Sequence, residues 1–237
     1  MTFQGNYTWG SAFDFENSYF FWNPRVGYGR ADGVRLHVFN LNHTYELPFG
    51  RGRTFFRDVS RPVDYVIGGW QLAGIWTWQS GLPFTPSYLD CGSDRDTGPC
   101  RATLVGDAHV SDPGRFGWFA TTTSGAASGC TTSTMRLDAN GCTRGPWTRP
   151  QRGTFGTVAR NSFFGPHFFN ADASLSKRFA ITENLSGQFR AELFNVFNHV
   201  NLGQPNTLVD SPSGGKITGL AALAQMRRWQ FGFRFDF

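Results

Sequence analysis

Four cysteines are the residues of this sequence best suited to covalent chemistry, and all of them lie between residues 82 and 166: Cys91, Cys100, Cys130 and Cys142. Four cysteines allow three pairings, and proximity along the chain favours Cys91 with Cys100 and Cys130 with Cys142. Such disulfides indicate an oxidising compartment. The alternative is a zinc site, but the short spacing usual between paired zinc ligands is missing.

The aspartates of the same segment are candidate ligands for a hard cation. Asp90, Asp94 and Asp96, with nearby carbonyls, supply several oxygens within one loop, as calcium requires. The complete calcium-binding loop with its closing glutamate is missing. Solvated carboxylates are the simpler interpretation, so we predict no metal site and no cofactor.

No motif of hydrolytic or nucleotide chemistry occurs in the sequence. A G-x-S-x-G elbow, an H-E-x-x-H zinc motif and a P-loop are all missing. The five histidines are isolated from one another, which favours structural or interfacial roles. We therefore expect a protein that is not an enzyme.

The composition suits a surface that faces something other than water. Aromatic residues make up 16% of the 237 residues and charged residues 16%, whereas soluble domains carry about 25% charged residues. No apolar stretch reaches the ~18 residues of a transmembrane helix, so any membrane crossing would use strands. No secretory signal is visible, so an outer-membrane destination predicts a further segment upstream.

The net charge of +5 rests almost entirely on arginine, because Lys177 and Lys216 are the only lysines. Arginine is well suited to bidentate contacts with phosphate. The arginines are scattered, however, and the aromatic residues form no cluster typical of RNA-binding domains. We therefore expect no nucleic-acid partner.

Alternation of apolar and polar residues is the strongest structural signal and predicts six β-strands. The alternating runs are 2–9, 37–47, 70–79, 168–179, 185–193 and 228–237. His43 and Lys177 are exceptions on otherwise apolar faces. Faces of Phe, Trp and Tyr mixed with Gly and Ala, on strands of about ten residues, favour a transmembrane barrel over a soluble sandwich.

The connections between these runs alternate in length, as expected of an outer-membrane barrel. If the chain ends on the periplasmic side, the external connections are 11–34, 82–166 and 198–227. The segment 82–166 is rich in Gly, Ser, Thr, Pro and Asp and is predicted to be one long external loop. The periplasmic connections are 180–184, a tight turn, and 48–65, which is longer than a periplasmic turn should be.

Two groups of polar residues are candidates for a role in binding. The polar faces of the last strands carry residues suited to a barrel lumen: Asp172, Arg178, Gln188, Arg190, Glu192, Arg228 and Arg234. Ordinary cross-strand pairing explains them equally well. Four asparagines follow the fifth run: Asn195, Asn198, Asn201 and Asn206. Their neighbours Gly203 and Pro205 favour a turn over a ligand site.

Four segments of the sequence resemble a known family. They are YELPFGRGR at 45–53, GGWQLAGIWTWQSGLPFTP at 68–86, FRAELFNVFNHVNLGQPNT at 189–207 and the terminal RRWQFGFRFDF. Their order and spacing resemble the C-terminal barrel of TonB-dependent receptors of the Oar-like, carboxypeptidase-regulatory-domain type. The resemblance implies transport across the outer membrane, driven by a TonB complex that acts on a plug domain. Barrels of that family have about 22 strands, so six strands imply a fragment or a truncated gene.

The resemblance also implies a role for the last strand. Its aromatic residues look like the signal that the barrel assembly machinery reads: Trp229, Phe231, Phe233, Phe235 and Phe237. The same residues would face lipid, and the two roles are compatible.

Together these patterns predict an all-β chain in which residues 1–237 form an antiparallel meander of about six long strands. This meander would be the C-terminal part of an outer-membrane barrel, with plug domain and signal peptide absent. The expected partners are outer-membrane lipid, the barrel assembly machinery, the TonB complex through the missing plug, and a large substrate such as a glycan, siderophore or peptide. The alternatives are a non-transporting structural or adhesive outer-membrane protein and a soluble carbohydrate-binding β-sandwich.

Overall fold

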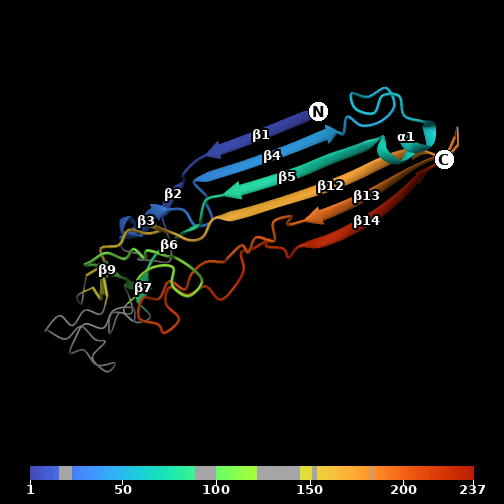
Figure 1. The fold of residues 1–237 in the computed structure, drawn as a ribbon. Helices are drawn as coiled ribbons and strands as arrows, with labels where there is room; N and C mark the ends of the chain where they lie inside the picture. The colour runs from blue at the N-terminus through green and yellow to red at the C-terminus, as the bar shows by residue number, and fades with distance from the viewer. Residues whose placement is uncertain (16–22, 89–99, 122–144, 151–153, 183) are drawn as a thin grey trace.

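One antiparallel sheet dominates the computed structural model, which describes residues 1–15, 23–88, 100–121, 145–150, 154–182 and 184–237 (Figure 1). Its six strands are β1 (Thr2–Trp9), β4 (His37–Glu46), β5 (Trp70–Gln79), β12 (Phe168–Ala180), β13 (Ser186–Phe194) and β14 (Arg228–Asp236). They pair in the order β1-β4-β5-β12-β13-β14, so each long strand lies beside the next one in the chain. The six predicted strands and the meander are confirmed.

The register of the sheet keeps most apolar residues of all six strands on one face; Ile75, opposite Asn42 and Asp172, is an exception. One row across the sheet runs Phe3, His43, Gly74, Ala173, Leu193 and Trp229. Successive residues of a strand point to opposite faces, so a slip of one residue in any pair would mix the two faces. The polar residues therefore share the other face, here called the polar face.

The apolar face remains uncovered across most of the sheet. Trp9 is 74% exposed and Phe233 67% exposed. The other sheets that the structure describes have two strands each and do not form a second layer. A soluble sandwich buries this face between two sheets, so the β-sandwich alternative is wrong. The sheet is open, with β1 and β14 at its edges.

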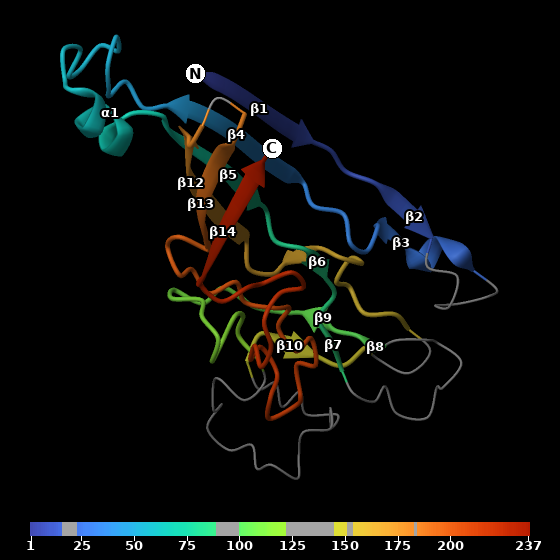
Figure 2. The ribbon, with the colours of Figure 1, turned by 90° about the vertical axis from the view of Figure 1, so that its right-hand side faces the viewer.

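The two ends of the sheet differ in what they carry, and both views show this (Figures 1 and 2). One end, here the α1 end, holds the turn 181–185, the C-terminus and the connection 47–69, which contains the helix α1 (Arg61–Ile67). The other, here the loop end, holds the connections 10–36, 80–167 and 195–227. The predicted alternation of the connections is confirmed. No helix that the structure describes is long and apolar enough to span a membrane.

The connections at the loop end fold together, and their described residues are here called the loop assembly. It contains the 3-10 helix η1 (Pro24–Gly27) and four pairs of short strands. These are β2 (Phe13–Phe15) with β3 (Tyr28–Arg30), β6 (Pro83–Phe84) with β11 (Phe163–Phe164), β7 (Ser87–Tyr88) with β8 (Cys100–Arg101), and β9 (Thr103–Leu104) with β10 (Trp147–Thr148). The described residues of the predicted long loop 82–166 thus contain short paired strands, because pairing satisfies backbone groups that burial would otherwise leave without partners.

A hydrophobic core lies inside the loop assembly and not against the long sheet. Its buried members are Phe84, Tyr88, Cys100, Ala102, Ala108, Phe119, Trp147, Val158 and Val209. Trp147 is 1% exposed, and its Nε1 donates a hydrogen bond to the carbonyl of Ala120 at 2.5 Å. Burial of each large side chain contributes about 1.5–3 kcal/mol, so the assembly has its own source of stability. Val209 ties the connection 195–227 into it.

Gly156 offers a test of this core. A Cβ there would lie 2.0 Å from the carbonyl oxygen of Arg101 and 2.6 Å from that of Ala102. We expect Gly156→Ala to destabilise the loop assembly by about 1–3 kcal/mol and to speed its proteolysis in detergent, with the long sheet retained. Gly114→Ala is the control, since a Cβ there meets nothing within 4 Å. Equal proteolysis of the two variants would count against this packing.

Candidate functional site

A hollow on the polar face of the sheet is the candidate functional site. Its volume is about 530 Å³, and residues of β4, β5, β12, β13 and β14 line it. Three of the lining residues are arginines: Arg178, Arg190 and Arg234. The rest of the lining is mostly small or uncharged, so the arginines dominate its electrostatics.

The register places these arginines side by side. Arg178 of β12 lies opposite Gln188 of β13, and Gln188 lies opposite Arg234 of β14, so the three form one row. Arg190 stands one row further along β13, opposite Gly232. Residues opposite one another on neighbouring strands are ~5 Å apart, and Gly232 leaves the space beside Arg190 open. The arrangement concentrates positive charge on a few neighbouring strand positions.

The acidic residues on the polar face neutralise this charge only in part. Arg190 Nη1 lies 3.5 Å from Glu192 Oε1, and Arg234 Nη2 lies 2.7 Å from Asp236 Oδ1. Both pairs are solvent-exposed, and such pairs contribute about 0–1 kcal/mol. Within the part of the chain that the structure describes, Arg178 forms no ion pair. An anionic group in the hollow would therefore meet the guanidinium of Arg178 without displacing a carboxylate, and would compete with Glu192 and Asp236 for Arg190 and Arg234.

The other predicted lumen residues lie on the polar face but play local roles. Asp172 Oδ1 accepts hydrogen bonds from the backbone N–H of Asn195 at 2.9 Å and from Asn170 Nδ2 at 3.0 Å. The guanidinium of Arg228 lies 4.6 Å from the ring centre of Phe194. The Asp172 carboxylate is thus engaged at the end of β13, and its role as a lumen residue remains a prediction.

The asparagines after β13 act as turn residues, as the sequence favours. Asn195 is 2% exposed and adopts φ 49°, and its Nδ2 donates to the carbonyls of His199 and Gln225 at 3.0 and 2.8 Å. Asn201 binds both backbone groups of Phe169: its Oδ1 accepts from N–H at 2.7 Å, and its Nδ2 donates to C=O at 2.8 Å. Asn206 donates to Ser213 Oγ at 2.8 Å, and Asn198 adopts φ 51°.

Arg160 is a buried cation that forms an ionic node with two exposed carboxylates, and the sequence pattern does not predict this node. It is 7% exposed and donates hydrogen bonds to the carboxylates of Asp14 and Asp32, the latter at 3.0 Å. Asn161 Nδ2 donates to Asp32 Oδ1 at 2.5 Å and to the carbonyl of Arg30 at 2.8 Å. The node joins the connection 10–36 to the end of 80–167. Asp32 and Asp14 lie 128 and 146 residues before Arg160 in the chain, and no local pattern marks them.

The charges of this node shift each other's pKa. The hydrogen bond from Asn161 is the main cause that lowers the pKa of Asp32; contacts with Arg160 act in the same direction, and burial opposes them. Burial alone would lower the pKa of Arg160, but the hydrogen bonds with Asp14 and Asp32 outweigh it and raise that pKa. Both shifts favour the ionised forms of Asp32 and Arg160. Burial raises the pKa of the Tyr88 phenol in the nearby core.

The cysteines and the aspartates considered as calcium ligands lie largely outside the described residues. Cys91, Cys130 and Cys142 lie there, as do Asp90, Asp94 and Asp96. Cys100 is buried in the core of the loop assembly and carries no free thiol. Among the described residues, no group of three or more His, Cys, Asp or Glu side chains is arranged to hold a metal ion. The cysteine pairing remains a prediction.

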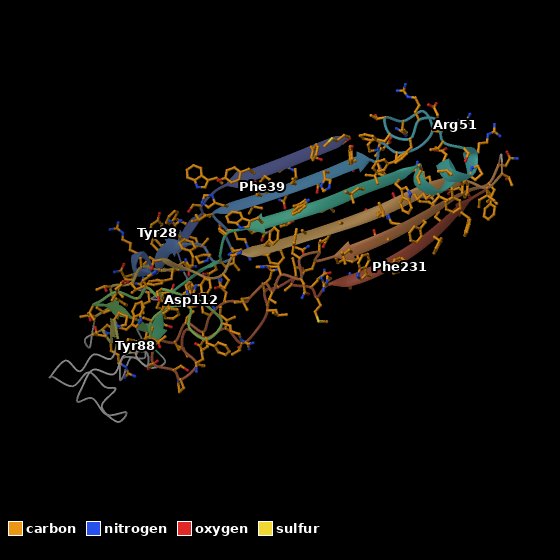
Figure 3. The ribbon with its side chains drawn as sticks, viewed as in Figure 1. Tyr28, Phe39, Arg51, Tyr88, Asp112 and Phe231 are labelled. Atoms are coloured by element: carbon orange, nitrogen blue, oxygen red, sulfur yellow. The ribbon has the colours of Figure 1, made fainter. Side chains whose placement is uncertain are left out.

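The aromatic residues of the last strand lie where the sequence predicts. Trp229, Phe231, Phe233 and Phe235 share the apolar face of β14 at the edge of the sheet, and Phe237, which follows the strand, is 99% exposed. Phe189 of β13 packs between two of them, 5.0 Å from the ring centre of Phe233 and 6.3 Å from that of Phe231. Figure 3 labels Phe231 on this strand. Their role as an assembly signal remains a prediction.

Comparison with known families gives one match, to a family described as outer membrane beta barrel domain, over residues 1–230. The matched residues include five long strands in full and the beginning of β14. No curated protein and no solved structure matches the chain. The match explains why one face of the sheet is apolar and uncovered, since the wall of such a barrel faces lipid.

Asn201 provides a test of the turn after β13. Asn201→Ala removes both hydrogen bonds to Phe169 and should lower stability by about 1–3 kcal/mol, because the backbone groups lose their partners. Asn201→Asp keeps the acceptor but sets a carboxylate oxygen against the carbonyl of Phe169 at a buried position, so we expect a loss at least as large as that of Asn201→Ala. Thermal unfolding in detergent, followed by circular dichroism, measures both. Unchanged midpoints for the two variants would show that the contact is dispensable.

The environment of His199 predicts that the stability of the loop end depends on pH. Burial and then the charge of His167, whose ring centre is 5.7 Å away, lower the pKa of His199. The folded state thus favours the neutral ring, so this stability is present above the unfolded pKa of about 6.5 and is lost as the pH falls below it. Between about pH 7.5 and 5.5, the midpoint of thermal unfolding should fall less in His199→Gln than in the parent protein. The exposed His109→Gln is the control, and should behave as the parent does.

Proposed function

Because the chain belongs to the outer membrane beta barrel domain family, we propose that it forms part of the wall of a receptor that imports a large nutrient with energy from a TonB complex. The family places the chain in the outer membrane. In this proposal the apolar face meets lipid and the polar face lines the passage. The observation that carries it is the register, which gathers the apolar residues of six strands on one face and the arginine-lined hollow on the other.

The loop assembly supports capture of a large substrate. It folds around its own core, so it can present a fixed surface, and it exposes aromatic side chains. Phe116 is 78% exposed with the Arg115 guanidinium 5.1 Å from its ring centre, and Tyr28 is 52% exposed beside Phe13 and Phe15. Aromatic faces and arginines suit a glycan or another large polar ligand. The arginines of the hollow favour a substrate with anionic groups.

Closure of the barrel is part of the proposal. Both β1 and β14 are edge strands, and unpaired backbone groups in lipid cost several kcal/mol each. We propose that further strands pair with these edges in the membrane, and that a plug domain, on which the TonB complex pulls, lies against the polar face. The exposed aromatic face of β14 supports its recognition by the barrel assembly machinery.

The loop assembly also supports an alternative, a structural or adhesive outer-membrane protein that does not transport. A surface with its own core can bind a partner without a passage behind it. A disulfide from Cys100 to Cys91 would stabilise that surface in either case, since the bond would lie beside the core.

Uptake experiments in cells separate the two functions. The protein would be expressed in its outer membrane with and without an active TonB complex and supplied with fluorescent acidic oligosaccharides. We expect accumulation only with the active complex. Arg178→Gln with Arg234→Gln should reduce it about a hundredfold, because two charged hydrogen bonds are lost and each is worth about 1.5 kcal/mol.

The exposed Arg61→Gln at the α1 end is the matched control, because it lies outside both the hollow and the loop assembly, and should leave accumulation unchanged. Accumulation that is independent of the TonB complex would rule out energised import. Surface binding without accumulation would favour the adhesive alternative.

A further inference from the structure

Two departures from the barrel pattern meet at the α1 end of the sheet. Lys177 is a cation on the apolar face, and the connection 47–69 is longer than a turn. Lys177 Nζ donates hydrogen bonds to the carbonyls of Val66, at 3.0 Å, and Gly68, and it lies 5.0 Å from the ring centre of Trp70. The lysine therefore binds the last carbonyls of α1, which carry partial negative charge.

Two more contacts fix α1 against the apolar face. Trp70 Nε1 donates to the carbonyl of Val66 at 3.0 Å, and the rings of Tyr65 and Phe179 meet edge to face at 6.0 Å. Trp70, Lys177 and Phe179 all belong to the apolar face by register. The helix thus lies on the side of the sheet that meets lipid.

The segment before α1 is folded against its end. Gly50 adopts φ 117°, and a Cβ there would lie 2.6 Å from Asp64 Oδ1. The same oxygen accepts a hydrogen bond from the backbone N–H of Arg51 at 2.5 Å. Phe56 adopts φ 65°, a conformation unusual for an aromatic residue. The connection 47–69 therefore has a defined conformation at the α1 end.

This element exposes large apolar side chains that continue the apolar face of the strands. They are Phe55 (53% exposed), Phe56 (62%), Val63 (45%), Tyr65 (51%) and Val66 (65%). Arginines stand among them at Arg51, Arg53, Arg57 and Arg61, and Figure 3 labels Arg51 at this end of the sheet. Their acidic neighbours are partly engaged: Asp64 binds the backbone of Arg51, and Glu46 lies 3.2 Å from Arg53.

We propose that residues 48–67 form an interfacial anchor that lies in the headgroup layer of the membrane leaflet at the α1 end. The aromatic and aliphatic side chains enter the boundary of the acyl chains, and the arginines bind phospholipid phosphates. Lipid is the occupant because the element is continuous with the lipid-facing side of the sheet and because its excess charge is positive. Lys177 and Trp70, through their hydrogen bonds to the end of α1, fix the position of the anchor relative to the membrane surface. Transport and the TonB complex play no part in this inference.

Photo-crosslinking of the full chain in the outer membrane tests the anchor. Benzoyl-phenylalanine in place of Phe56 or Tyr65 should give phospholipid adducts, detected by mass spectrometry. The same group in place of Phe116, which is as exposed but lies in the loop assembly, is the control and should give none. Adducts to protein alone, or no phospholipid adduct at Phe56 and Tyr65, would overturn the proposal.

A second measurement tests the arginines. The purified protein, reconstituted as a closed barrel in vesicles of phosphatidylcholine with or without phosphatidylglycerol, should give at least a twofold higher adduct yield at Phe56 when the anionic lipid is present. Arg51→Gln with Arg57→Gln should remove the increase. An increase that persists in this variant would overturn their role as phosphate ligands. If the protein does not take up a nutrient, the adduct yields at Phe56 and Tyr65 and their dependence on anionic lipid are still expected. The anchor proposal and the transport proposal can therefore be disproved separately.

Discussion

The two-residue period of the β-strand is the constraint on which this structure depends. It gives every long strand one apolar and one polar face, and pairing in register carries both faces across six strands. A slip of one residue at any pairing would bring arginines of the hollow onto the side that meets lipid. The register therefore sets both the membrane surface and the candidate site behind it.

This constraint also explains where the protein packs. A sheet whose apolar face meets lipid has no protein layer that covers this face. The side chains that the protein buries against itself therefore lie mainly at the two ends of the sheet. At the loop end a hydrophobic core and the Arg160 node hold three connections together. At the α1 end a short helix is held by a lysine, a tryptophan and a ring contact.

The exceptions to the alternation have local partners that make them tolerable on an apolar face. Lys177 reaches the carbonyls at the end of α1. His43 Nδ1 accepts a hydrogen bond from Trp76 Nε1 at 3.3 Å. Gly74 makes room for that ring, since a Cβ there would lie 2.4 Å from His43 Cε1. Polar groups in an apolar environment are costly without such partners, so each exception marks a tertiary contact.

The sequence by itself determined the six strands to within about a residue at each end, their order, the residues on each face and the two kinds of connection, because alternation is a local property. It also favoured a turn for Asn195 and Asn201. Only the tertiary structure decided the core around Trp147, the Arg160 node, the engagement of Asp172 and the position of α1. These features join residues far apart in the chain, and a contact between such residues leaves no period in the sequence.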